Sequence, residues 1–186
     1  MKDISLHILD IIENSVKAGA KQIALRFSWS GNMLSVMISD NGPGFPKSIK
    51  DDPSNPFKTT RTERKVGLGL SFLKEAAEES GGSFKVSEAA GGGVVVAADF
   101  NMNSIDAKPA GDISDLILTA IIAWPQTDFL VYAGKDGDEI LSTVAIREEI
   151  EDGNLSRPEL RTFILETLRK ELSPLQDWAE ATFRKV

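Results

Sequence analysis

The chain has 186 residues, of which 41% are hydrophobic and 26% charged, values typical of a globular protein with one sizeable domain or a domain with an appendage. Its 28 acidic and 21 basic side chains leave a net charge of −7, which argues against non-specific nucleic-acid binding. With no cysteine and a single histidine, disulfides, thiolate metal sites and histidine-based metal cages are excluded. We see no leader pattern and no apolar run of membrane-spanning length, and therefore expect a cytoplasmic protein without a membrane partner.

The first half of the chain combines helical and strand patterns. Apolar residues recur at helical spacing over residues 3–17, with Asp3 in the position of an N-cap. The elements expected next are strands at 22–29 and 34–39, a helix at 66–80, and strands at 83–87 and 94–100. Residues 41–65 are polar and rich in glycine and proline, so they are predicted to form a long loop, a kind of segment that is usually functional or mobile.

The second half follows a break at residues 101–111, which carry Asn, Pro and Gly and few apolar residues. Beyond it we expect a helix at 113–123, strands at 128–132 and 139–146, and helices at 157–172 and 175–184. Pro174 is predicted to separate the last two helices. The sequence thus predicts two domains, 1–103 and 104–186, with a linker at about 101–111. The second is a small α+β unit whose role the sequence leaves open.

One face of the first predicted helix carries three polar side chains of different chemistry. Asp10, Asn14 and Lys17 project within a narrow arc, opposite the isoleucine residues of the same helix. On spacing alone, a solvated surface is the better interpretation. The segments that follow along the chain change that interpretation.

Two glycine-containing segments flank the long loop. The first, Asp40-Asn-Gly42-Pro-Gly44, comes directly after a predicted strand. The second, Gly67-Leu-Gly69-Leu, opens a predicted helix, where backbone amides and the helix dipole favour an anion. Each segment alone is weak evidence, because the first also fits a generic turn and the second fits close helix packing.

Taken in order, four segments resemble the boxes of the GHKL family of ATPases and kinases, which includes histidine kinases, anti-sigma-factor kinases, the gyrase B subunit and MutL. They are Asp10-Ile-Ile-Glu-Asn14-Ser-Val-Lys17-Ala-Gly-Ala20, Asp40-Asn-Gly42-Pro-Gly44, Pro56-Phe57-Lys-Thr59-Thr60 and Gly67-Leu-Gly69-Leu. Order and spacing match over residues 4–100. The resemblance implies a Bergerat ATP-binding fold, an α/β (α+β) two-layer sandwich in which helices cover one face of a mixed, mostly antiparallel sheet. It is closest to the histidine-kinase-like ATP-binding domain, with a MutL-like first box.

The resemblance also implies roles for these residues with ATP and Mg²⁺. Asp40 would accept a hydrogen bond from the exocyclic amine of adenine, and Gly42 and Gly44 would let the chain pass close to the base. Asn14 would give an amide oxygen to Mg²⁺, and Lys17 would neutralise phosphate charge. The backbone amides expected to bind phosphate belong to Gly67, Leu68 and Gly69. Residues 46–65 are expected to form a lid that is mobile without nucleotide, and this lid includes Thr59, Thr60, Arg61 and Lys65.

Two positions depart from the family pattern. Val94 stands where many members have threonine, so a side-chain hydroxyl of the adenine-recognising network is missing or moved. Val66 precedes the last box, where threonine or serine is frequent. Both departures predict weaker ATP binding rather than a different fold.

Three functions remain open at this point. The first is a Mg-ATP-binding regulatory protein that acts on a partner protein as a phosphotransferase or an ATP-driven switch. The others are a slow ATPase of the MutL or gyrase type and a non-catalytic nucleotide sensor. Asp10 stands where the ATPases typically carry a glutamate base, so it leans towards catalysis. The single histidine, His7, is predicted to pack in the core, and we expect no phosphoacceptor hairpin; a homodimer remains open.

Overall fold

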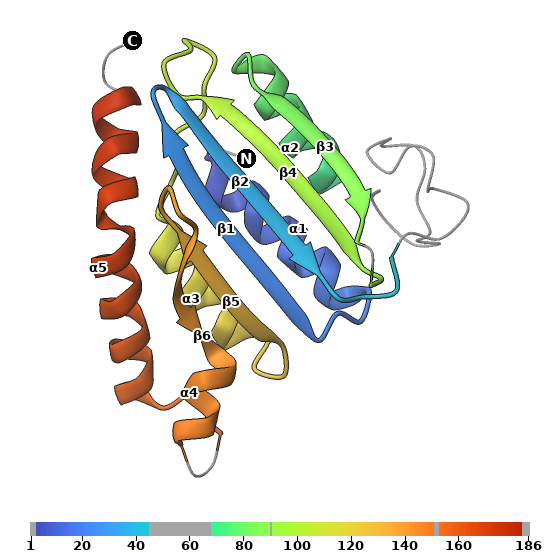
Figure 1. Ribbon diagram of the computed structural model, residues 1–186, viewed down its shortest axis with the longest axis vertical. Coiled ribbons are helices and arrows are strands. Elements are labelled where there is room, and N and C mark those ends of the chain that lie inside the picture. The colour runs from blue at the N-terminus through green and yellow to red at the C-terminus, as the bar shows by residue number, and fades with distance from the viewer. Residues whose placement is uncertain (1–2, 45–67, 90, 151–152, 184–186) are drawn as a thin grey trace.

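A single mixed sheet organises the molecule. The computed structural model describes residues 3–44, 68–89, 91–150 and 153–183. The six strands lie in the order β3-β4-β2-β1-β5-β6 (Figure 1). Their bounds are β1 Gln22–Ser30, β2 Met33–Asp40, β3 Ser83–Glu88, β4 Val94–Asn101, β5 Asp128–Ala133 and β6 Asp138–Ser142. Because β1 pairs in parallel with β5 and every other pairing is antiparallel, the mixed, mostly antiparallel sheet predicted from the sequence is confirmed.

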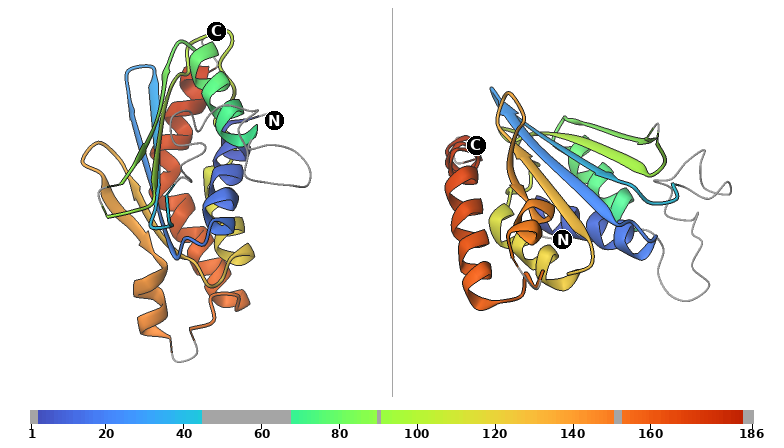
Figure 2. Two further views of the ribbon diagram at one scale, coloured as in Figure 1. Left: turned by 90° about the vertical axis from the view of Figure 1, so that its right-hand side faces the viewer. Right: turned by 60° about the horizontal axis from the view of Figure 1, so that its bottom comes forward.

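The helices lie on one face of this sheet and along one edge, and the opposite face is left open (Figure 2). Their bounds are α1 Ile4–Lys17, α2 Leu68–Glu79, α3 Ile113–Ala123, α4 Thr143–Glu149 and α5 Pro158–Phe183. Asp3 caps α1 by accepting a hydrogen bond from the amide of Leu6 at 3.0 Å. The isoleucine side of α1 is buried against the sheet, as its helical spacing predicts. No helix in the described ranges combines the length and the apolar composition that a bilayer crossing requires.

The second half of the chain continues the same sheet. β5 lies beside β1, with Phe129 opposite Ile23 and Val131 opposite Leu25. The buried core is also continuous and includes residues from both sides of residue 104. Within the predicted linker, Met102 is fully buried. The division into 1–103 and 104–186 stays a proposal about independent units, which truncation would test.

The predicted strand at 139–146 is wrong in its second half. β6 ends at Ser142, and residues 143–149 form α4 instead. The side chain of Ser142 accepts a hydrogen bond from the amide of Ala145 at 3.2 Å, so it caps the new helix. The apolar residues that suggested a strand thus belong to a strand end followed by one short helix.

The predicted break at Pro174 is also wrong, because α5 runs through it. Proline has no amide hydrogen, so the carbonyl of Lys170, four residues earlier, loses its usual helical donor. The hydroxyl of Ser173 donates to that carbonyl at 3.0 Å and replaces the missing bond. Buried Leu172 and Leu175 hold both halves of the helix against the core. The local cost of the proline is therefore offset by a neighbouring hydroxyl and by packing.

Candidate functional site

The carboxylate of Asp40, the last residue of β2, is held by donors from three separate segments. The hydroxyl of Ser15 on α1 donates to Oδ2 at 2.7 Å. The amides of Gly42 and Val94 donate to Oδ1 at 2.9 and 3.3 Å. Val94 has no side-chain hydroxyl, but its backbone contributes to the site nevertheless. The carboxylate is therefore fixed at the end of the sheet beside α1.

Two glycines of the second box, and the glycine just before β4, lie close to their neighbours at this end of the sheet. A Cβ on Gly42 would lie 3.1 Å from Oδ1 of Asp40, and one on Gly44 would lie 3.4 Å from the Glu88 side chain. Gly93 is more restricted, because its φ is +91° and a Cβ there would lie 1.9 Å from the carbonyl oxygen of Asp40. A side chain at position 93 would require the backbone to move.

Asp10 and Asn14 lie at the junction between α1 and α2. A Cβ on Gly69, in the first turn of α2, would lie 1.8 Å from Oδ2 of Asp10 and 3.3 Å from Nδ2 of Asn14. The absence of a side chain at Gly69 is therefore what allows the carboxylate and the amide to approach the start of α2. The structure thus brings together two residues of the first box and one of the last box.

Lys17 lies one turn further along α1, and its ammonium pairs with the carboxylate of Glu13. Both side chains are well exposed, at 51% and 40%. An exposed pair of this kind contributes at most about 1 kcal/mol, so Lys17 is free in energetic terms to exchange Glu13 for another anion.

Part of the predicted site lies outside the described residues. Those residues are Thr59, Thr60, Arg61, Lys65 and Gly67, together with the predicted lid. Leu68 is the first residue of α2. The phosphate-binding amides and the lid remain predictions.

The sequence-based analysis missed the roles of Ser15 and Gly93. Ser15 lies on the buried side of α1 and is 7% exposed, and helical spacing alone indicates burial there but no hydrogen-bond partner. Its partner Asp40 is 25 residues away, and no local spacing rule predicts such a bond. Gly93 belongs to a run of three glycines that reads as an ordinary hairpin turn. Its position against the Asp40 backbone depends on the pairing of β2 with β4.

His7 lies on α1 and is buried, as its position among apolar residues predicts, with 1% of its surface exposed. Burial, followed by the charge of Lys108, lowers the pKa of His7 from 6.5 to about 4. Neither ring nitrogen has a hydrogen-bond partner among the described residues, and the ring meets Phe72 edge-on with 6.5 Å between centroids. A neutral, packed imidazole is what this environment favours.

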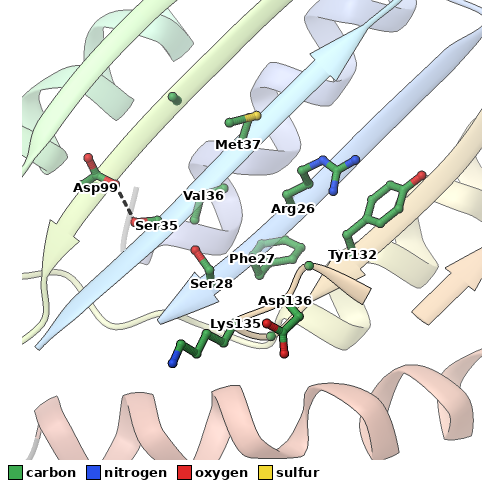
Figure 3. Close-up of a pocket in the computed structure, with 13 residues that line it drawn as sticks. Arg26, Phe27, Ser28, Ser35, Val36, Met37, Asp99, Tyr132, Lys135 and Asp136 are labelled. Atoms are coloured by element: carbon green, nitrogen blue, oxygen red, sulfur yellow. Dashed lines mark hydrogen bonds between the residues drawn. The ribbon is translucent and has the colours of Figure 1, made fainter. Parts of the chain in front are cut away.

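A concave region, here termed the outer hollow, lies on the open face of the sheet (Figure 3). It has a volume of about 380 Å³ and lies over β1, β2 and β4, beside the turn that joins β5 to β6. The guanidinium of Arg26 stacks over the Tyr132 ring, 3.8 Å from its centroid, and the hydroxyl of Ser35 donates to Asp99 at 2.6 Å. None of the residues predicted to bind nucleotide lines the outer hollow.

Comparisons with known proteins show to which family the first part of the chain is similar. The model of the family described as "Histidine kinase-, DNA gyrase B-, and HSP90-like ATPase" matches residues 2–112. The sensor histidine kinase TmoS of Ectopseudomonas mendocina is 30% identical over 106 residues, which cover 52% of this chain and 11% of that protein. The C4-dicarboxylate transport sensor protein DctB of Rhizobium meliloti (strain 1021) is 28% identical over 91 residues, covering 46% of this chain and 14% of that protein. The chain thus spans under a fifth of the length of these relatives.

Among solved structures, the ATPase domain of Aquifex aeolicus MutL, complexed with ADP, matches with a TM-score of 0.53. The match covers 76% of this chain and 63% of that chain at 15% identity, so it shows the fold alone. This structural match covers a larger part of the chain than the family match over residues 2–112. The two-layer α/β architecture predicted from the sequence is confirmed.

Proposed function

Because this chain belongs to the histidine kinase-, DNA gyrase B- and HSP90-like ATPase family, we propose that it is a Mg-ATP-binding regulatory protein that acts on a partner protein, either as a phosphotransferase or as an ATP-driven switch. Its family segment is a histidine-kinase-like ATP-binding domain. The observation that carries the proposal is the Asp40 carboxylate, which accepts hydrogen bonds from Ser15, Gly42 and Val94. A carboxylate that is held in place is a suitable acceptor for the exocyclic amine of adenine.

The surroundings of Asp40 also fit a flat base. Gly42 and Gly44 carry no side chains, and a flat ring would approach the backbone there. Asp40→Asn can present an amide donor to the adenine amine in place of an acceptor, so this variant should lose selectivity for adenine.

The opposite end of the proposed site would hold the phosphates. Asn14 would offer its amide oxygen to Mg²⁺. Gly69 lets the Asn14 amide and the Asp10 carboxylate lie against the start of α2, where the phosphates would bind. Lys17 would exchange its exposed partner Glu13 for phosphate oxygens. When bound, Mg-ATP supplies the γ-phosphoryl group as the electrophile. The predicted lid would then exclude water from this end.

Asp10 supports hydrolysis or transfer rather than sensing alone. Its carboxylate lies beside Gly69, where the phosphates are proposed to bind. There it would orient the attacking water or partner hydroxyl and take its proton. A slow ATPase of the MutL or gyrase type is the second candidate, and the same position of Asp10 favours it. The two functions differ in whether water or a partner side chain receives the phosphoryl group.

Calorimetry with Mg-ATP tests the binding step directly. We expect an affinity in the micromolar range or weaker, because Val94 lacks the hydroxyl found in many relatives. Asn14→Ala should weaken the Mg²⁺-dependent part of binding. Absence of heat, combined with no competition against a fluorescent ATP analogue, would refute the proposal. Labelled ATP with and without native cell extract then distinguishes free phosphate, a labelled partner and no turnover.

A further inference from the structure

The hydroxyl of Ser15 is the one side-chain donor to Asp40 among the described residues, since Gly42 and Val94 donate through their backbones. We propose that Ser15 is a positioning residue for recognition of the nucleobase, and that its hydroxyl fixes the oxygen of Asp40 that receives the exocyclic amine of adenine. This inference rests on the proposed function and adds to it a residue that determines base specificity.

The distribution of hydrogen bonds identifies that oxygen. A carboxylate oxygen offers about two acceptor positions. Oδ1 already accepts from the amides of Gly42 and Val94, at 2.9 and 3.3 Å. Oδ2 accepts from Ser15 alone among the described residues, at 2.7 Å. An incoming amine therefore finds its acceptor on Oδ2, the oxygen that Ser15 holds.

Ser15 is well placed to keep this oxygen still. It is 7% exposed and lies on the buried side of the last turn of α1, so its side chain is confined by the packing of the helix on the sheet. With the hydroxyl in place, donors hold both oxygens and the plane of the carboxylate is set before the base arrives. Without the hydroxyl, the carboxylate can rotate about the Oδ1 bonds, and binding must restrict that rotation.

The residue at position 94 makes the hydroxyl of Ser15 important for holding Asp40. Valine there supplies only an amide, whereas threonine would add a hydroxyl near the same carboxylate. The hydroxyl of Ser15 comes from the opposite side, from a helix rather than from a strand. The chain thus has its side-chain donor to Asp40 on α1, and Val94→Thr offers a way to place one on β4.

The test compares ATP with ITP, whose base has a carbonyl group in place of the exocyclic amine. Ser15→Ala should lower the affinity for Mg-ATP by roughly tenfold, the effect of one hydrogen bond to a charged group, and change that for Mg-ITP by less than about twofold. Ser15→Cys, which keeps a similar volume with a weaker donor, should give an intermediate ATP-to-ITP ratio. Recovery of the ratio in Ser15→Ala/Val94→Thr would support the inference further.

Ser28→Ala is the matched control, because it removes a serine hydroxyl from the outer hollow and should leave both affinities unchanged. Thermal unfolding of each variant checks that it is folded. An unchanged ratio of the affinities for ATP and ITP in folded Ser15→Ala and Ser15→Cys would overturn the inference. The proposed function would still stand in that case, provided that the wild-type protein binds Mg-ATP. If the wild-type protein binds no Mg-ATP, the proposed function and this inference both fail.

Discussion

Asp40 and Arg26 are charged residues of the paired strands β2 and β1, and their side chains belong to opposite faces of the sheet. Asp40 is held by hydrogen bonds from three segments, with Gly93 packed against its backbone. Arg26 is exposed, and its recorded contact is the stack on Tyr132 (Figure 3). The Asp40 carboxylate is held by several packed segments at once, whereas the exposed Arg26 side chain can change its conformation in solvent. We therefore expect substitutions to have large effects around Asp40 and small effects in the outer hollow.

The largest effect is expected from Asp10→Asn on any turnover of ATP. This change keeps the shape of the side chain and removes the base, so turnover should fall by about 10²–10⁴-fold while ATP still binds. Steady-state release of phosphate and calorimetry measure the two quantities separately. Asp10→Glu, which restores the glutamate typical of the related ATPases, is the informative companion variant. Turnover in Asp10→Asn equal to wild type would favour a mechanism in which the base belongs to the partner protein.

The next largest effect concerns the turn before β4. Gly93→Ala should lower the free energy of unfolding by about 3 kcal/mol, because it adds a side chain at φ +91° and places it against the carbonyl of Asp40. Gly91→Ala is the matched control, since a Cβ there has no neighbour within 4 Å. Urea unfolding of both variants measures the difference. Equal stability of the two would show that this turn is not packed against Asp40 in solution.

The candidate site also shows which features could be predicted from the sequence and which could not. Asp10, Asn14, Gly42 and Gly69 were singled out by the resemblance of four ordered segments to the boxes of the family, since helical spacing or a glycine-containing turn alone was weak evidence. The hydrogen bond between Ser15 and Asp40 could not be predicted from the sequence, because it depends on how α1 packs on the sheet. The continuity of α5 through Pro174 was missed for a different reason: a neighbouring serine offsets a rule that usually holds. The ordered segments thus predicted the candidate residues, whereas contacts such as Ser15–Asp40 depend on long-range packing.

A smaller effect is expected from pH, through His7. Burial lowers its folded-state pKa from 6.5 to about 4, so the unfolded chain takes up a proton at higher pH than the folded one. Stability is therefore lost as pH falls below about 6.5, down to about 4, and the loss from this group between pH 7 and pH 5 is about 2 kcal/mol. His7→Leu should remove this contribution. Urea unfolding at both pH values tests it, and the same pH dependence in the variant and the wild type would contradict it.

The smallest effect is expected in the outer hollow. Arg26→Met keeps the apolar stem of the side chain and removes the guanidinium that stacks on Tyr132. An exposed interaction of this kind contributes about 0.5–1 kcal/mol, so stability should fall only slightly. The affinity for Mg-ATP should stay within about twofold of wild type, as calorimetry would show. A larger loss of affinity would mean that the two faces of the sheet are coupled.

The parallel pairing of β5 with β1 has a consequence for any attempt to isolate the first predicted domain, residues 1–103. In the full chain β1 is an interior strand, with β2 on one side and β5 on the other. A chain ended at residue 103 would turn β1 into an edge strand, with the amides and carbonyls that face β5 left without partners. Long uncovered edges of this kind pair with other copies of themselves. We therefore expect the truncated protein to aggregate at concentrations at which the 186-residue chain does not. Residues 104–186 would thus prevent aggregation by covering this edge of β1.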